Sequence, residues 1–193
     1  MRIKLLSILT TFLMLSSCKL IYSHTAIDSY WLNKIVYTRH GIHFQDRVYS
    51  TANFLKGPGY IPEGQELTVI YVTDDKATVL YNRIKIDIKN SEWNSDKNID
   101  ELLLELFTEE KFEPLKFPDF FQKSASVGMP MLGMTKKQIR HCCGPPPKGF
   151  NPDLRSDRWI YWMDQFEKVE LKFFEDILID ISKPKTSINI KFY

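Results

Sequence analysis

The amino-acid sequence predicts an α+β protein in which a β-rich part precedes a part built of helices and strands. Within residues 30–110, apolar and polar residues alternate repeatedly, as in Ile84–Lys89, which is typical of half-buried strands. Near residue 135 a helix-start signal is followed by an apolar helical stripe and a Gly-Pro break. Strand-like runs rich in aromatic and β-branched residues follow between 159 and 181.

The first 17 residues predict a cleaved export signal. Two basic residues near the start precede the uncharged, mostly apolar run Leu5–Leu15. This run suits a secretory signal and is too short to span a bilayer as a helix. Two serines then precede Cys18, as small residues do at a signal cleavage site. An ordinary cleaved signal with a chance cysteine is the alternative interpretation.

The tetrapeptide Leu15–Cys18 resembles the lipobox of bacterial lipoproteins. This resemblance implies a diacylglycerol on the Cys18 sulfur and an acylated amine, and several acyl chains at roughly 0.8 kcal/mol per buried CH₂ make a stable anchor. Residues 18–29 are then a lipidated tether. Because Lys19 is not the aspartate linked to inner-membrane retention, the resemblance implies the outer membrane, with the protein facing the periplasm or, in some bacteria, the cell surface.

The composition disfavours some classes of function. The chain has 26 basic and 24 acidic residues, and residues 1–17 hold two of the basic ones and none of the acidic ones, which leaves 24 of each. A nucleic-acid partner is therefore disfavoured, because phosphate binding needs a basic face. A hydrophobic fraction of 44% with 13% aromatic residues is enough for a core. No run after Cys18 is long and apolar enough to cross a membrane.

Residues 30–110 are expected to form a small β-barrel or meander that ends in a helix. Turn signals lie at 57–59, 74–75 and 82–83. The expected strands are Ile35–Tyr37, Leu67–Thr73, Lys76–Tyr81 and Ile84–Ile88, with Val48–Leu55 as a strand or a short helix. The run Ile61–Gly64 followed by two hairpins resembles a bacterial SH3-like domain. An apolar stripe predicts a helix over Asp96–Phe107, and two prolines near 114–118 place a domain boundary at residues 110–118.

The clearest local pattern in the C-terminal part is a helix start at Thr135. Gln138 follows three residues later, which is the spacing of a capping box. Met134 and Ile139 are placed to form the accompanying hydrophobic staple. Gly133 lets the chain turn into the helix.

The same helix has a predicted apolar face and a predicted end. Ile139, Cys142 and Cys143 share one face at i, i+3 and i+4. Gly144 ends the helix, and the prolines at 145–147, Pro146 among them, prevent its continuation. The strands expected after it are Trp159–Met163, Val169–Phe174 and Ile177–Ile181, and the alternating run Ile188–Phe192 favours an extra C-terminal strand.

These motifs together resemble the SmpA/OmlA family of BamE-like outer-membrane lipoproteins. The motifs are Gly133–Ile139 with its Gly-Met-Thr start and Gln138, then Gly144–Pro146, then Trp159–Trp162, then Val169–Phe173. The resemblance implies an α-α-β-β-β unit within a domain at 118–193, with a short first helix over Asp119–Gly128. It also implies envelope protein partners, the β-barrel assembly machinery among them. Large aliphatic residues stand in that family where Cys142 and Cys143 stand here.

The aromatic and cysteine residues have a structural and a functional interpretation. Trp159, Tyr161 and Trp162 are expected in the core and at the sheet edge rather than in a ligand cage. Cys142 and Cys143 are interpreted as buried small residues, with a redox pair or a soft-metal site with His141 as the alternatives.

No catalytic constellation is found in the sequence, so no enzyme activity, cofactor or metal is expected. His40 and His43 lie near each other, but no further ligand follows at metal-site spacing. The leading hypothesis is a lipid-anchored envelope lipoprotein that acts as a protein-binding or scaffold module. The alternatives are peptidoglycan or ligand binding through the SH3-like part, and inhibition of an enzyme.

Overall fold

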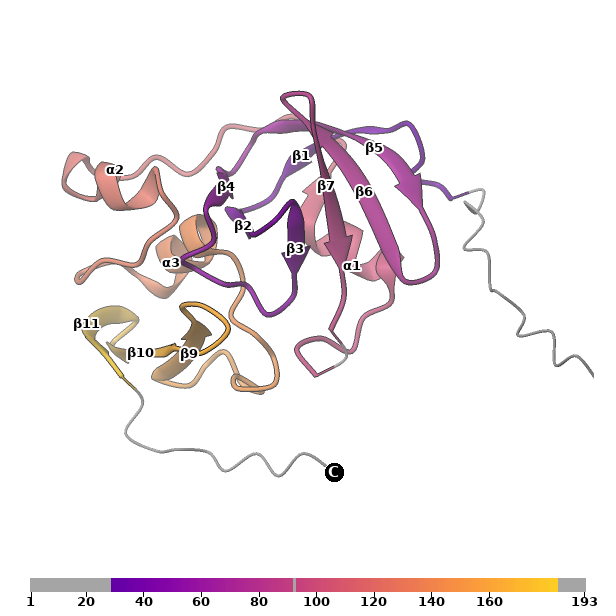
Figure 1. The fold of residues 1–193 in the computed structure, drawn as a ribbon. Coiled ribbons are helices and arrows are strands. Elements are labelled where there is room, and N and C mark those ends of the chain that lie inside the picture. Colours follow the sequence, from indigo (N-terminus) through magenta and orange to yellow (C-terminus); the bar gives the residue numbers. More distant parts are fainter. Residues whose placement is uncertain (1–28, 92, 184–193) are drawn as a thin grey trace, which may run out of the picture.

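The computed structural model describes residues 29–91 and 93–183, and within them the protein is of the α+β class. Cys18, the export signal, most of the tether and the run Ile188–Phe192 lie outside the described residues. Figure 1 shows a curled sheet with one helix against it, and a smaller sheet with two further helices beside it. Below, the N-terminal half is residues 29–108 and the C-terminal half is residues 119–183.

The N-terminal half contains eight strands and one helix. They are β1 (Ile35–Thr38), β2 (Ile42–Phe44), β3 (Val48–Ser50), β4 (Gly59–Ile61), β5 (Glu66–Val72), β6 (Lys76–Tyr81), β7 (Ile84–Lys89), α1 (Ile99–Leu106) and β8 (Phe107–Thr108). Six of these strands form one sheet in the order β3-β7-β6-β5-β1-β8, and β2 pairs with β4. All pairings are antiparallel except that of β3 with β7, which is parallel.

Tight turns set the register of the hairpins. In the turn Asn82-Arg83 both residues have positive φ, 46° and 68°, which is the type I′ geometry that matches the right-handed twist of the flanking strands. The β6–β7 register follows from it, with Tyr81 opposite Ile84 and Val79 opposite Ile86. The alternation of apolar residues in β7 thereby places Ile86 and Ile88 in the core.

Helix α1 covers the large sheet and begins later than its apolar stripe suggested. Asn98 is the N-cap and forms a reciprocal capping box with Glu101, so the predicted start at Asp96 is wrong by three residues. Leu102, Leu103 and Leu106 are buried in the larger core, where each contributes roughly 1.5–3 kcal/mol, whereas Leu104 is exposed. The chain leaves α1 directly into β8, so Phe107 is a strand residue and not a helical one.

The C-terminal half contains two helices and one antiparallel sheet. They are α2 (Asp119–Ala125), α3 (Lys136–Cys143), β9 (Arg158–Trp162), β10 (Lys168–Phe174) and β11 (Ile177–Ser182), and the sheet order is β11-β10-β9. Its core combines residues of α3 and of this sheet with Leu55 of the N-terminal half. No helix among the described residues has the length and apolar character needed to cross a bilayer.

Buried or half-buried side chains of the N-terminal half bind backbone carbonyls of the C-terminal half. The Tyr60 hydroxyl donates to the Cys142 oxygen at 2.9 Å, and the Asn53 amide donates to the Cys143 oxygen at 2.8 Å. His43 Nε2 lies 2.9 Å from the Gly128 oxygen. Since each such bond contributes about 1 kcal/mol and an unpaired buried carbonyl costs more, these contacts fix the two halves against each other.

Glycines allow this close approach. A Cβ at Gly41 would lie 2.0 Å from the Cys142 oxygen, so no side chain fits there. Gly128 has φ +70°, and a Cβ on it would lie 2.4 Å from both His43 Nε2 and a Tyr60 ring carbon. Any larger residue at either position would force the junction apart.

Candidate functional site

The capping box predicted at Thr135 is present at the start of α3. The Thr135 hydroxyl accepts from the Gln138 N–H at 3.1 Å, and the Gln138 side-chain oxygen accepts from the Thr135 N–H at 2.9 Å. Met134 is fully buried in the smaller core with Ile139. Gly133 has φ +88°, as a turn into the helix requires.

The same Gly-Met-Thr segment also pairs with the outer edge of β11. The Gly133 N–H donates to the Leu178 oxygen, and the Leu178 N–H donates to the Met134 oxygen, both at 2.8 Å. Thr135 forms an isolated antiparallel bridge with Ile177. The segment therefore acts as a short strand before it becomes a helix, a role that the capping signal alone did not predict.

The remaining motif residues hold the end of α3 on the small sheet. Gly144 has φ +78° at the helix C-terminus, and its oxygen accepts from the Tyr161 hydroxyl at 2.8 Å. Pro146 is buried. Trp159 and Tyr161 are fully buried, whereas Trp162 is half-exposed with Lys168 Nζ 4.6 Å from its ring centroid.

The two described cysteines are buried on the core face of α3 and form no disulfide. Their sulfur atoms lie 3.3 Å apart, and burial raises the pKa of Cys143. A protonated, buried thiol is neither a good nucleophile nor a metal ligand. Among the described residues no three His, Cys, Asp or Glu side chains lie close enough to hold a metal, and His40 and His43 bind different carbonyl groups.

A basic groove of about 650 Å³ lies between the two halves, and the sequence did not predict it. The basic groove is lined by five basic side chains, namely Arg39, Lys136, Lys137, Arg140 and Arg155, and by two acidic ones, Glu105 and Asp176. Its walls also include His40, His141, Leu154 and Trp159. The residues after β1 and on α1 form one side of it, and α3 with the loop before β9 forms the other.

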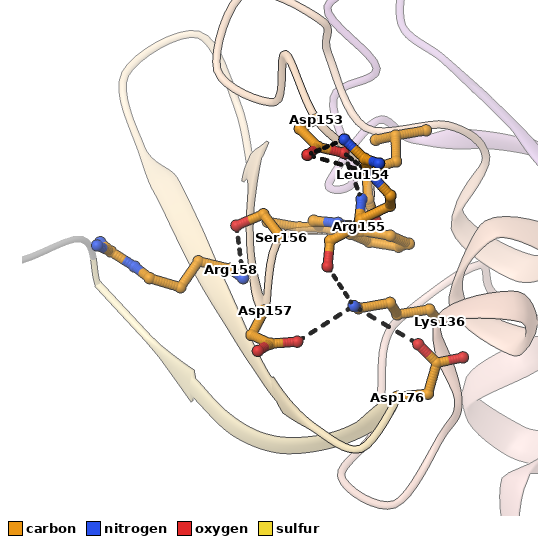
Figure 2. A network of polar contacts seen from close by, with 9 residues as sticks. Lys136, Asp153, Leu154, Arg155, Ser156, Asp157, Arg158 and Asp176 are labelled. Carbon is orange, nitrogen blue, oxygen red and sulfur yellow. Dashed lines mark hydrogen bonds and ion pairs between the residues drawn. The ribbon is translucent and has the colours of Figure 1, made fainter.

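Part of this charge is neutralised within the protein. Figure 2 shows Lys136 Nζ between the Arg155 oxygen at 3.1 Å, Asp157 at 3.3 Å and Asp176 at 3.5 Å. Asp153, on the same loop, binds the Arg155 guanidinium at 3.0 Å. This network joins the start of α3, the loop before β9 and the β10–β11 turn.

The rest of the charge in the basic groove is not neutralised by the described residues. Lys137 and Arg140 are exposed on α3, and no acidic side chain in the described ranges pairs with them. Arg39 donates through Nε to the Phe107 oxygen at 2.6 Å, and no carboxylate in residues 29–91 or 93–183 pairs with its guanidinium. Glu105 is already paired with Lys97 at 2.6 Å. Three like charges around one groove repel one another, and an anion would relieve that repulsion.

His40 adds an unusual polar atom to the basic groove. Its Nδ1 lies 3.0 Å from the Gly41 oxygen, and since a carbonyl can only accept, Nδ1 carries the proton. Its Nε2 is buried and has no partner among the described residues. Burial lowers the pKa of His40, so the imidazole is neutral and Nε2 presents a lone pair.

The second distinct surface is the outer edge of β11, here called the β11 edge and defined as Ile179–Ser182. The Gly133–Lys136 segment covers the edge only as far as Leu178, and no strand in the described part of the chain pairs with the rest. Ile179 is 56% exposed and Ile181 38% exposed. The opposite edge, at β9, is covered, because Asn151 pairs with both backbone groups of Ile160.

Comparisons with protein-family models, with curated proteins and with solved structures each found no significant match to this chain.

Proposed function

We propose that the protein is a lipid-anchored envelope lipoprotein of the SmpA/OmlA type that binds a protein partner through the β11 edge. In this proposal Cys18 carries the lipid at the outer membrane and the folded part faces the periplasm. The N-terminal half is the SH3-like module, and the C-terminal half is the α-α-β-β-β unit that contacts the partner.

The order of elements in the C-terminal half supports the family part of the proposal. Helices α2 and α3 precede β9, β10 and β11, which is the order that the resemblance implies. The Gly-Met-Thr segment lies at the start of α3, the Gly-Pro break lies at its end, and the Trp-Tyr run lies within β9. The anchor rests on the residues up to Cys18, which the sequence alone supplies.

The single observation that carries the binding role is the β11 edge, which pairs with no strand among residues 29–91 and 93–183 and carries the exposed side chains of Ile179 and Ile181. Unpaired main-chain groups beside exposed isoleucines form a template for strand addition, in which backbone hydrogen bonds give affinity and side-chain contacts give specificity. The protein already adds a segment of its own, Gly133–Lys136, to the same edge. We therefore assign the occupant as an extended segment of an envelope protein that continues this pairing along Ile179–Ser182.

A pair of matched variants tests the binding role. Ile179→Asp places a charge on the β11 edge, and Ile35→Asp places the same charge on β1 at nearly the same exposure, 54% against 56%. After mild detergent extraction, the unmodified protein and Ile35→Asp are expected to co-purify with the same envelope protein, and Ile179→Asp is expected to lose it. Equal recovery with both variants, or recovery of no envelope protein above background with any of them, contradicts the proposal.

The anchor is tested separately at Cys18. Metabolic labelling with a fatty-acid analogue is expected to mark the unmodified protein and not Cys18→Ala. Mass spectrometry of the processed N-terminus should then find diacylglycerol on the cysteine. An unlabelled protein that begins at a residue other than Cys18 would show that the signal is an ordinary one.

A further inference from the structure

We propose that the basic groove binds a phosphate-ester ligand, held by Arg39, Lys137 and Arg140 across the junction of the two halves. This site is distinct from the β11 edge and depends on neither the lipid anchor nor the partner.

The first argument is the concentration of unpaired charge in an otherwise balanced protein. Residues 18–193 carry as many acidic as basic side chains, yet the basic groove gathers five basic residues against two acidic ones. The acids that line it, Glu105 and Asp176, already pair with Lys97 and Lys136. The cations at Arg39, Lys137 and Arg140 are left to act on whatever enters the groove.

The second argument is the chemistry of these side chains. A guanidinium offers a planar fork of N–H donors that matches two oxygens of one phosphate, and a lysine adds a mobile point charge. Arg39 and Arg140 come from opposite walls, so a ligand between them bridges the two halves. A groove of about 650 Å³ is within the range that holds a small organic molecule. Three backbone N–H groups at the start of α3 are already occupied, because Asp176 accepts from Lys136 and Thr135 accepts from Gln138 and Ile139.

The third argument is the unpaired nitrogen of His40. Because Nε2 has almost no exposed surface, a ligand oxygen reaches it only with a small movement of its neighbours, and it would then supply the partner that Nε2 lacks among the described residues. An anionic oxygen repels a lone pair, so His40 takes up a proton when the anion binds. The titratable and charged groups that face His40 are Glu105 from α1, which favours the proton, Arg140 from α3, which opposes it, and His141 from α3. A bound anion would act in the same direction as Glu105 and favour the proton on His40.

Calorimetry on the full chain in a mild non-ionic detergent tests the proposal. The probes are pyrophosphate, glycerol 3-phosphate and a short-chain phosphatidic acid below its micelle concentration, with citrate as a non-phosphate polyanion at equal ionic strength. We expect saturable binding of the phosphate probes, weakened as salt rises, and weaker binding of citrate. Equal affinity for glycerol 3-phosphate and phosphatidic acid identifies a soluble phosphate ester. A tenfold preference for phosphatidic acid identifies a lipid headgroup, with the same chemistry of recognition.

Matched charge-removal variants locate the site. Lys137→Gln and Arg140→Gln are each expected to weaken binding about tenfold or more, because each removes a charge-assisted interaction with the anion. Lys85→Gln removes an exposed lysine from β7, away from the groove, and should leave binding unchanged. Thermal unfolding without ligand checks that all three variants fold.

Three outcomes overturn the proposal. The first is that no phosphate probe binds saturably, and the second is that citrate binds as tightly as pyrophosphate. The third is that Lys85→Gln weakens phosphate binding as much as Arg140→Gln does. Repeating the titration in two buffers of different ionisation enthalpy measures the proton taken up by His40, and His40→Gln should abolish that uptake. Uptake that persists in His40→Gln would remove His40 from the site.

Discussion

Acidification should destabilise the protein through His43, which is buried at the junction of the two halves. Its Nε2 donates to the Gly128 oxygen, its Nδ1 is buried without a partner among the described residues, and the neutral ring lies 4.8 Å from the Tyr60 ring. Burial lowers the pKa of His43 to about 4, because desolvation penalises the charged imidazole. In the unfolded chain the pKa is that of a free histidine, about 6.5.

The sign and size of the effect follow from these two pKa values. Below pH 6.5 the unfolded chain binds the proton while the folded protein does not, so the free energy of unfolding falls as the pH falls. The contribution of His43 is fully present above pH 7, is reduced by about 2 kcal/mol at pH 5, and is reduced by about 3 kcal/mol at pH 4.

Denaturant unfolding at pH 7 and pH 5 measures this loss, and a non-titrating variant isolates it. His43→Gln keeps an amide donor for the Gly128 oxygen, so its free energy of unfolding should change by about 2 kcal/mol less between the two pH values than that of the unmodified protein. Equal pH dependence of the two proteins would refute the reasoning. If the variant does not fold, an NMR titration of the unmodified protein measures the pKa of His43 directly. A pKa near 6.5 would refute the argument that burial lowers it.

Five further substitutions, in three comparisons, test the turns and caps by the free energy of unfolding. Gly133→Ala should lower the free energy of unfolding by about 1–2 kcal/mol, through its positive φ alone. Gly128→Ala should lower it by about 1–3 kcal/mol more, because the added Cβ would clash with His43. Equal losses for the two variants would contradict the tight junction. Arg83→Gly should stabilise the protein by up to about 1 kcal/mol, because glycine adopts the positive φ of a type I′ turn without strain. A destabilised variant would contradict that turn geometry. Thr135→Ala should cost about 1 kcal/mol and Thr135→Ser much less, and equal costs would show that the hydroxyl is not the cap.

Local features of the fold could be predicted from the sequence because their causes are local. The Asn82-Arg83 turn and the alternation of β7 are decided by neighbouring residues, and so is the capping box at Thr135. The apolar stripe predicts the start of α1 three residues too early, because Asp96 and Asn98 are both good caps. Only Asn98 has a glutamate three residues later to close a capping box.

Features that join distant segments could not be predicted from the sequence. The three-residue strand β3 pairs parallel with β7, and a run that short carries little periodic signal. The basic groove gathers Arg39 and Arg140 on its opposite walls, and the equal numbers of acidic and basic side chains within residues 18–193 give no sign of such a patch. The spacing of Lys136, Lys137 and Arg140 on one side of α3 was the one local sign that a basic surface existed.

Site-specific photo-crosslinking in the cells that make the protein tests the central claim most directly. A photoreactive residue replaces Ile179 on the β11 edge or, as the matched control, Ile35 on β1, and mass spectrometry identifies what is captured. The proposed function predicts that Ile179 captures one envelope protein, through an extended segment of it, and that Ile35 does not. Capture of the same proteins from both positions, or from neither, would contradict it.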